Sequence, residues 1–209
     1  MALVLLLAGC STAPQGTAAG SSPAAPAQST PSAIARARAD SIRYPYTEAD
    51  VRFMSAMIGH HAQALQMALW APTHAASPSV RTLAERIING QQDEIGTMQR
   101  WLRDREKPVP DPDRTGTEHS NHHGSSMPGM LSEVQLEQLE AARGAEFDRL
   151  FLTFMIQHHR GAVSMVRELF GTPGAARDET VFQFANDVSV DQSTEVARME
   201  KMLAALAPE

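Results

Sequence analysis

The stretch FMIQHHRGAVSM, residues 154–165, places two adjacent histidines inside a run that otherwise has the pattern of a buried helix. The same pattern occurs earlier in the chain as AMIGHHAQALQM, residues 56–67. Each residue of an α-helix advances by about 100°, so two adjacent histidines lie on the two flanks of one apolar stripe. Both stretches therefore predict a helix that carries a histidine pair on its inward face.

The two stretches belong to an internal repeat that covers most of the chain. In the first helix of the repeat, Asp50, Phe53, Met57, Ile58, His60, His61, Ala64 and Met67 recur as Asp148, Phe151, Met155, Ile156, His158, His159, Ala162 and Met165. In the second helix, after a short difference in length, Ala84, Gln91, Glu94, Met98 and Leu102 recur as Ala185, Gln192, Glu195, Met199 and Leu203. The sequence therefore predicts two duplicated helical hairpins.

Helix signals divide the repeat into four segments, in a chain that is 5% aromatic and poor in β-branched residues. The first is expected from Thr47, a potential N-cap, to Leu69, before Pro72. The third is expected to begin at a capping box of Ser132 and Gln135 and to bend at Gly144. The predicted fold is an all-α four-helix bundle, with hairpin 1 at about 47–105, a linker at 106–130 and hairpin 2 at about 131–206.

The N-terminal segment MALVLLLAGCS resembles a bacterial lipoprotein signal peptide. Its apolar run is too short to span a bilayer, and small residues precede Cys10. The resemblance implies that residues 1–9 are cleaved and that Cys10 carries a lipid anchor. Residues 10–44 follow as a flexible tether rich in Ala, Pro and Ser, and the bundle takes residues 45–209. We therefore expect an extracytoplasmic domain attached to a membrane.

Candidate metal ligands lie on the inward faces of both hairpins. They are Met57, His60, His61, Met67 and Glu94 in hairpin 1, and Met155, His158, His159, Met165 and Glu195 in hairpin 2. Imidazole suits Cu(II) and zinc, whereas thioether sulfur selects Cu(I) and similar soft ions. The mixture of histidine and methionine favours copper, with silver or zinc as alternatives.

The predicted linker repeats this chemistry as HSNHHGSSMPGM, residues 119–130. We expect an accessory metal site there, formed by His119, His122, His123, Met127 and Met130. Only His74 lies outside the three clusters, and we expect it at the surface.

The segments MIGHHAQALQMA (57–68) and FDRLFLTFMIQHHRGAVSM (147–165), each followed by a helix with Gln-x-x-Glu, resemble the family catalogued as domain of unknown function 305. This resemblance covers about residues 45–206. It implies a ferritin-like four-helix bundle and, because the family includes CopM-like exported copper-binding proteins, a role in copper sequestration or delivery. The residues to which it assigns that role are His60, His61, Met57, Met67, His158, His159, Met155 and Met165.

Two other functions compete with copper binding. In a non-metal envelope lipoprotein that binds another protein, the histidines would be satisfied inside the core, through hydrogen bonds such as Glu94–His60 or Glu195–His158. A metal-dependent redox enzyme is the weaker alternative, because the four helices lack Glu-x-x-His and a single cysteine excludes Cys-x-x-Cys-His. The net charge of −6 gives no reason to expect nucleic-acid binding. We therefore expect no enzymatic activity.

Overall fold

The computed structural model describes residues 32, 35–36, 38–39, 45–112 and 127–206. Within 45–112 and 127–206 the chain forms five helices and no β-strand, with one isolated bridge between Ala75 and Gly144. The helices are α2 (Glu48–His74), α3 (Pro78–Asp104), α5 (Glu133–Ala141), α6 (Gly144–Gly171) and α7 (Glu179–Ala205). The predicted all-α fold is confirmed.

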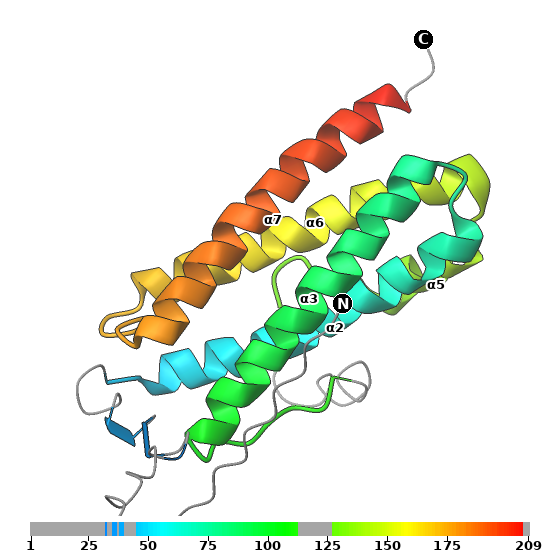
Figure 1. Ribbon diagram of the computed structural model, residues 1–209. Helices are drawn as coiled ribbons and strands as arrows, with labels where there is room; N and C mark the ends of the chain where they lie inside the picture. The colour runs from blue at the N-terminus through cyan, green and yellow to red at the C-terminus, as the bar shows by residue number, and fades with distance from the viewer. Residues whose placement is uncertain (1–31, 33–34, 37, 40–44, 113–126, 207–209) are drawn as a thin grey trace, which may run out of the picture. The chain divides into compact units, whose positions relative to one another are not determined.

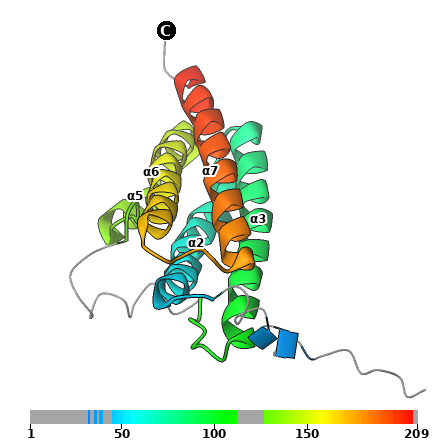
Figure 2. The same cartoon turned by 90° about the vertical axis from the view of Figure 1, so that its left-hand side faces the viewer.

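The helices pair as the internal repeat predicts. Helix α2 packs on α3, α6 packs on α7, and the two hairpins meet mainly through α2 and α6 (Figures 1 and 2). Helices α2 and α6 are antiparallel, because the start of each contacts the turn that follows the other. This is the predicted four-helix bundle of two duplicated hairpins.

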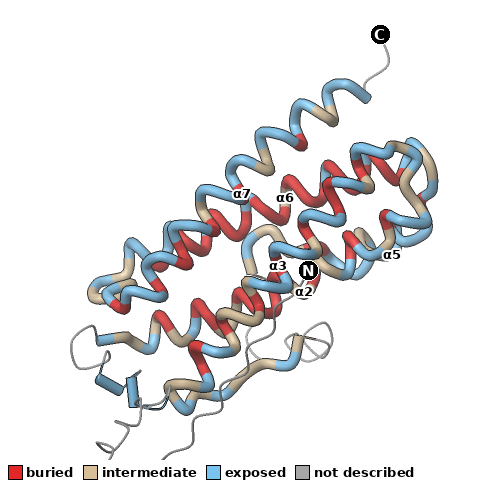
Figure 3. The backbone as a smooth tube through the Cα atoms, viewed as in Figure 1, coloured by how far each residue is buried: buried red, intermediate tan, exposed pale blue. Residues whose placement is uncertain are grey.

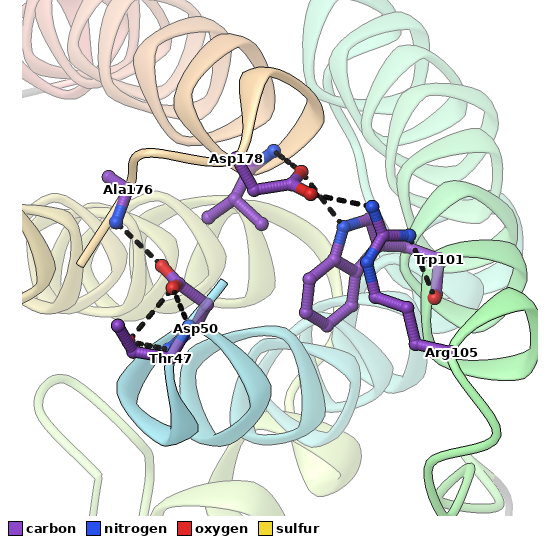
Figure 4. Close-up of polar contacts among 7 residues, drawn as sticks. Thr47, Asp50, Trp101, Arg105, Ala176 and Asp178 are labelled. Atoms are coloured by element: carbon purple, nitrogen blue, oxygen red, sulfur yellow. Dashed lines mark hydrogen bonds and ion pairs between the residues drawn. The ribbon is translucent and has the colours of Figure 1, made fainter. Parts of the chain in front are cut away.

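Two equivalent aspartates connect each hairpin to the turn of the other. Asp50, near the start of α2, accepts a hydrogen bond of 2.6 Å from the backbone N–H of Ala176, in the α6–α7 turn (Figure 4). Asp148, near the start of α6, accepts one of 2.8 Å from the backbone N–H of Ser77, in the α2–α3 turn. Both aspartates are almost fully buried. Their recurrence in the sequence therefore reflects a reciprocal contact across the bundle.

One end of the bundle carries an additional polar contact between the hairpins. The Arg105 guanidinium lies 2.5 Å from the Asp178 carboxylate, and Trp101 Nε1 donates to the same carboxylate at 3.0 Å (Figure 4). Asp178 also caps α7 by accepting from the backbone N–H of Val181. The side chains of Arg105 and Asp178 are only 7% and 2% exposed, so the pair links the end of α3 to the start of α7 away from water.

The predicted third helix is divided in two. Ala142 and Arg143 adopt extended backbone angles, and Gly144 begins α6 with a φ of +65°. The break lets Leu139 of α5 turn inward and join the core beside Phe147. Burial of that side chain offsets the helix hydrogen bonds lost at the break. The capping box of Ser132 and Gln135 is confirmed at the start of α5.

The first helix also differs from the prediction at its end. The capping box formed by Thr47 and Asp50 confirms its start, but α2 continues past Leu69 to His74 with Pro72 inside it. The proline removes one helix hydrogen bond, whereas the buried Ala71 carbonyl still accepts from Ala75 N at 3.0 Å. Packing of this last turn therefore outweighs the local signal of the proline.

The N-terminal predictions lie almost entirely outside the described residues. The signal peptide, Cys10 and most of the expected tether are among them. Within the tether, residues 35–36 and 38–39 are helical, and Arg36 N donates to Ser32 O at 3.0 Å. Alanine and arginine are strong helix formers, which accounts for this turn, and the tether as a whole stays a prediction. Across the described part of the chain, no helix combines the length and apolar character that a membrane span requires.

Candidate metal centre

A layer of buried histidines separates two halves of the hydrophobic core. One cluster of core residues contains Met67 and Met155, and the other contains Met57 and Met165. Because α2 and α6 are antiparallel, each cluster takes one of these methionines from each hairpin. The histidines lie between the two clusters along α2 and α6, and all four are fully buried: His60, His61, His158 and His159. Figure 3 shows the buried stretches of these helices.

The central pair of the layer comes from different hairpins. The ring centroids of His60 and His158 are 3.9 Å apart, with an angle of 40° between the rings. The neighbouring rings within each hairpin are farther apart, at 6.5 Å for His60–His61 and 6.3 Å for His158–His159. The layer therefore has a shared centre and one flanking histidine in each hairpin.

Each flanking histidine is paired with a carboxylate of the same hairpin. His61 Nε2 lies 2.6 Å from Glu94 Oε2, and His159 Nε2 lies 2.7 Å from Glu195 Oε2. An ionised carboxylate only accepts, so Nε2 carries the proton and Nδ1 of a neutral ring carries the lone pair. Both Nδ1 atoms are buried and have no hydrogen-bond partner in the described structure. The hydrogen bonds Glu94–His60 and Glu195–His158, which the non-metal alternative suggested, are therefore wrong. Glu94 and Glu195 bind the flanking histidines instead.

The central histidines also have nitrogens without partners. His60 Nε2 donates to the backbone carbonyl of Pro128 at 3.0 Å, and its Nδ1 has no partner among the described residues. Neither ring nitrogen of His158 makes a well-formed hydrogen bond in the same part of the chain, although the nearby backbone of His60 raises the pKa of this ring against the larger effect of burial. The amides of Gln91 and Gln192 are likewise buried without a partner in the residues described. Such groups are costly in a folded core, so the unpartnered ring nitrogens of the histidine layer point to a ligand.

Burial keeps the central histidines neutral. It lowers the pKa of His60 to about 3, with a further contribution from the adjacent His61, against the opposing effect of the Pro128 carbonyl. Burial, together with the neighbouring His60, also holds the pKa of His158 well below its usual value. Neutral imidazole is the form that binds a metal ion. The layer therefore presents its central rings in the ligand form at neutral pH.

The methionines of the prediction lie above and below this layer. Met57, Met67 and Met155 are fully buried, and Met165 is 8% exposed. Among the described residues, no group of three or more His, Cys, Asp or Glu side chains is arranged to hold a metal ion. The donors that the fold brings together are therefore imidazole nitrogens, with thioether sulfurs in the adjacent core clusters.

The end of the predicted linker is packed against the layer. We call residues 127–131 the strap. Gln63 donates to Leu131 O at 3.1 Å and accepts from Leu131 N at 2.8 Å, and Gln157 donates to Gly129 O at 3.3 Å. Met127 packs against the core cluster that contains Met57. The last residues of the predicted linker are therefore held against the bundle by these contacts.

Sequence reasoning missed the strap, although one signal was present. Gln63 of α2 occupies the position of the repeat that Gly161 has in α6. A Cβ at Gly161 would collide with the Pro128 carbonyl, so the glycine lets the strap approach α6. The difference between Gln63 and Gly161, inside an otherwise repeated motif, was thus the sequence signal for the strap.

The remaining histidines lie away from the layer or outside the described residues. His119, His122 and His123 of the predicted accessory site lie outside the described residues. Met130 of the same predicted site lies half-buried in the strap. His74 is half-buried at the end of α2, where Nε2 lies 3.0 Å from Glu140 O and Nδ1 lies 2.8 Å from Thr73 Oγ1. His74 thus lies at the edge of the bundle, half-buried and held by these two contacts, where we had expected a surface residue.

The fold and this layer define a duplicated helical bundle with a buried histidine–methionine core. The chain belongs to the DUF305 family, a domain of unknown function whose model matches residues 50–203. Comparison with curated proteins gives no match.

Solved structures agree with this assignment. A DUF305 fragment from Deinococcus radiodurans is 30% identical, with a TM-score of 0.64 over 77% of this chain and 99% of that chain. A DUF305 protein from Streptomyces coelicolor, named as a candidate secreted protein, is 26% identical, with a TM-score of 0.64 over 76% of this chain and 93% of that chain. CopM in its Cu(II)-bound form is 30% identical, with a TM-score of 0.61 over 76% of this chain and 97% of that chain. CopM structures with Cu(I) and with silver are also similar.

Proposed function

We propose that this protein binds copper through the buried histidine layer, for sequestration or delivery outside the cytoplasm. The observation that carries the proposal is the set of buried ring nitrogens on four histidines that have no partner among the described residues. Neutral imidazoles flanked by methionines suit both oxidation states of copper. CopM has been solved with Cu(II), Cu(I) and silver, which supports a metal of this group.

We assign the proposed ligands from burial and from the ring nitrogens without partners, since the described structure arranges no group of three or more His, Cys, Asp or Glu side chains around a metal position. His60 and His158 form the shared centre, with Nδ1 as the donor atom of His60, and His61 and His159 flank it through Nδ1. Glu94 and Glu195 act through the histidines they orient, since a carboxylate on the far nitrogen of a ligand fixes its tautomer. Met57, Met67, Met155 and Met165 are the candidate sulfur ligands.

The proposal is tested by copper titration of the full chain. A Cys10→Ser background removes the only thiol of the sequence, so that the titration does not report copper bound to that cysteine. His158→Ala with His159→Ala should lower copper stoichiometry or affinity and leave the helical circular dichroism largely intact. His74→Ala is the matched control and should titrate like the parent. Unchanged copper binding with a large loss of apo stability would instead favour the non-metal bundle, in which the histidines only set helix register.

The cellular location and the accessory site belong to the same proposal. Lipidation at Cys10 would hold the bundle at the outer face of a membrane, so Cys10→Ser should shift the protein from the membrane fraction to the soluble fraction. His119, His122 and His123, with Met127 and Met130, would form a weaker site that fills after the bundle. NMR during copper addition should then show the bundle histidines responding first.

A further inference from the structure

The strap closes one side of the histidine layer. Pro128 reaches His60, and a Cβ on Gly129, which has a φ of +78°, would come within 2.6 Å of the Gln157 carbonyl. The adjoining Leu131 is 6% exposed and is held by two hydrogen bonds to Gln63. The described residues of the strap are therefore packed closely against this side of the layer.

The α3 and α7 side connects the layer to solvent through the Glu–His pairs. The side chains of Glu94 and Glu195 are 23% and 29% exposed, whereas those of His61 and His159 are 0% exposed. Each carboxylate therefore has one end in contact with water and the other on a buried imidazole. The second nitrogen of that imidazole is the unpartnered Nδ1 inside the layer.

Helix α7 adds two more carboxylates to this side. Asp187, Asp191 and Glu195 are spaced four residues apart, which places them along one face of the helix. Like charges at this spacing destabilise a helix. Local desolvation raises the pKa of Asp191, and the negative charges of Glu94, Asp187 and Glu195 raise it further. Glu94 of α3 thus belongs to the same electrostatic cluster as the three carboxylates of α7.

We call Asp187 and Asp191 the acidic stripe, and these two residues are not part of the repeated pattern. The positions of α3 that correspond to Asp187 and Asp191 are Arg86 and Gly90. The second hairpin therefore carries two charges that weaken its own helix, beside a carboxylate that touches the buried layer. A cation attracted to these charges would offset their repulsion.

We propose that metal ions reach the histidine layer from the α3–α7 side, attracted by Asp187 and Asp191 and guided inward by the Glu94–His61 and Glu195–His159 pairs. This inference rests on the proposed copper-binding function and adds the route by which that site is filled. Asp187 and Asp191 act as a steering surface and not as ligands, because both are exposed. They should therefore govern the rate of loading and leave the equilibrium unchanged.

The test compares the full chain with Asp187→Asn plus Asp191→Asn, both in the Cys10→Ser background. Cu(II) is mixed with apoprotein at low ionic strength, and the quenching of tryptophan fluorescence is followed by stopped flow. The double variant should load about 10-fold more slowly, the lower end of the range for electrostatic steering. The difference should disappear in about 1 M salt, where screening acts over roughly 3 Å. Copper content after gel filtration should be equal.

The matched control is Glu133→Gln plus Glu137→Gln in α5, which removes two exposed charges at the same spacing from another part of the surface. It should load at the parental rate. Equal loading rates for the acidic-stripe variant and the parent at low salt, with normal copper content, would overturn the access route and leave the proposed function standing. Failure of the parent itself to retain copper would overturn both.

Discussion

The two hairpins share some features and differ in others, and the two sets have different roles. Both hairpins keep the aspartate that binds the opposite turn, and both keep the Glu–His pair that enters the buried layer. Hairpin 1 alone has Trp101 and Arg105, where hairpin 2 has Met202 and Leu206. The shared features build the layer and the antiparallel contact. The differences locate the strap, the acidic stripe and the contact of Asp178 with Trp101 and Arg105, which we call the polar lock.

The polar lock gives the largest expected effect. Asp178→Ala should lower the free energy of unfolding by about 3–5 kcal/mol, because it leaves the buried Arg105 without its counter-ion and removes the cap of α7. Urea denaturation followed by circular dichroism measures the loss. The control is Glu200→Ala, which breaks the exposed Arg160–Glu200 pair and should cost less than about 1 kcal/mol. Similar losses for both variants would show that the lock does not bind the hairpins together.

The strap comes next, and it tests a position at which the hairpins differ. Gly161→Ala should destabilise the protein by about 1–3 kcal/mol, since the new methyl group collides with Pro128 and must displace the strap from His60. Gly90→Ala is the matched control, with nothing within 4 Å of the added carbon. That control should stabilise α3 by roughly 0.5–1 kcal/mol. Two substitutions of the same kind should thus have opposite signs, and equal signs would show that the strap is loosely held.

The repeat and the helical periodicity predicted the two hairpins and the inward position of all four histidines. Those features depend on local spacing, which a sequence displays directly. The hydrogen bond between His60 and Pro128 joins residues 68 positions apart, and the break at Ala142 depends on where Leu139 packs. Contacts of this kind depend on how the helices lie against one another, so periodicity alone could not supply them.

Acid should weaken the layer at the pair that the two hairpins share. The folded pKa values of His60 and His158 lie below the unfolded value of 6.5, so the unfolded chain binds more protons as the pH falls. Stability from these groups is complete above pH 6.5 and decreases toward the folded pKa, which is about 3 for His60. Each buried histidine should contribute a slope of up to about 1.4 kcal/mol per pH unit.

The measurement is the free energy of unfolding of the apoprotein between pH 7 and pH 4. His158→Gln should reduce the slope over this range, and His74→Gln, outside the layer, should not. If His158→Gln left the slope unchanged, His158 would not be held neutral by burial in the folded protein.

The smallest expected effect concerns the acidic stripe, and it separates stability from function. Because the pKa of Asp191 is raised in the folded protein, its ionised form opposes folding above the unfolded value of 3.8 and is neutral in effect below it. Asp191→Asn should therefore stabilise the apoprotein at pH 7 by about 0.2–0.5 kcal/mol, the size of a like-charge pair on a helix surface. The gain should vanish near pH 3, and Glu137→Gln in α5 should show no comparable gain. Combined with slower copper loading by the Asp187→Asn plus Asp191→Asn variant, the gain would mean that hairpin 2 carries a charge repulsion that hairpin 1, with Gly90 at the corresponding position, lacks. A loss of stability in Asp191→Asn would show that the carboxylate has a favourable partner and that repulsion does not dominate at this surface.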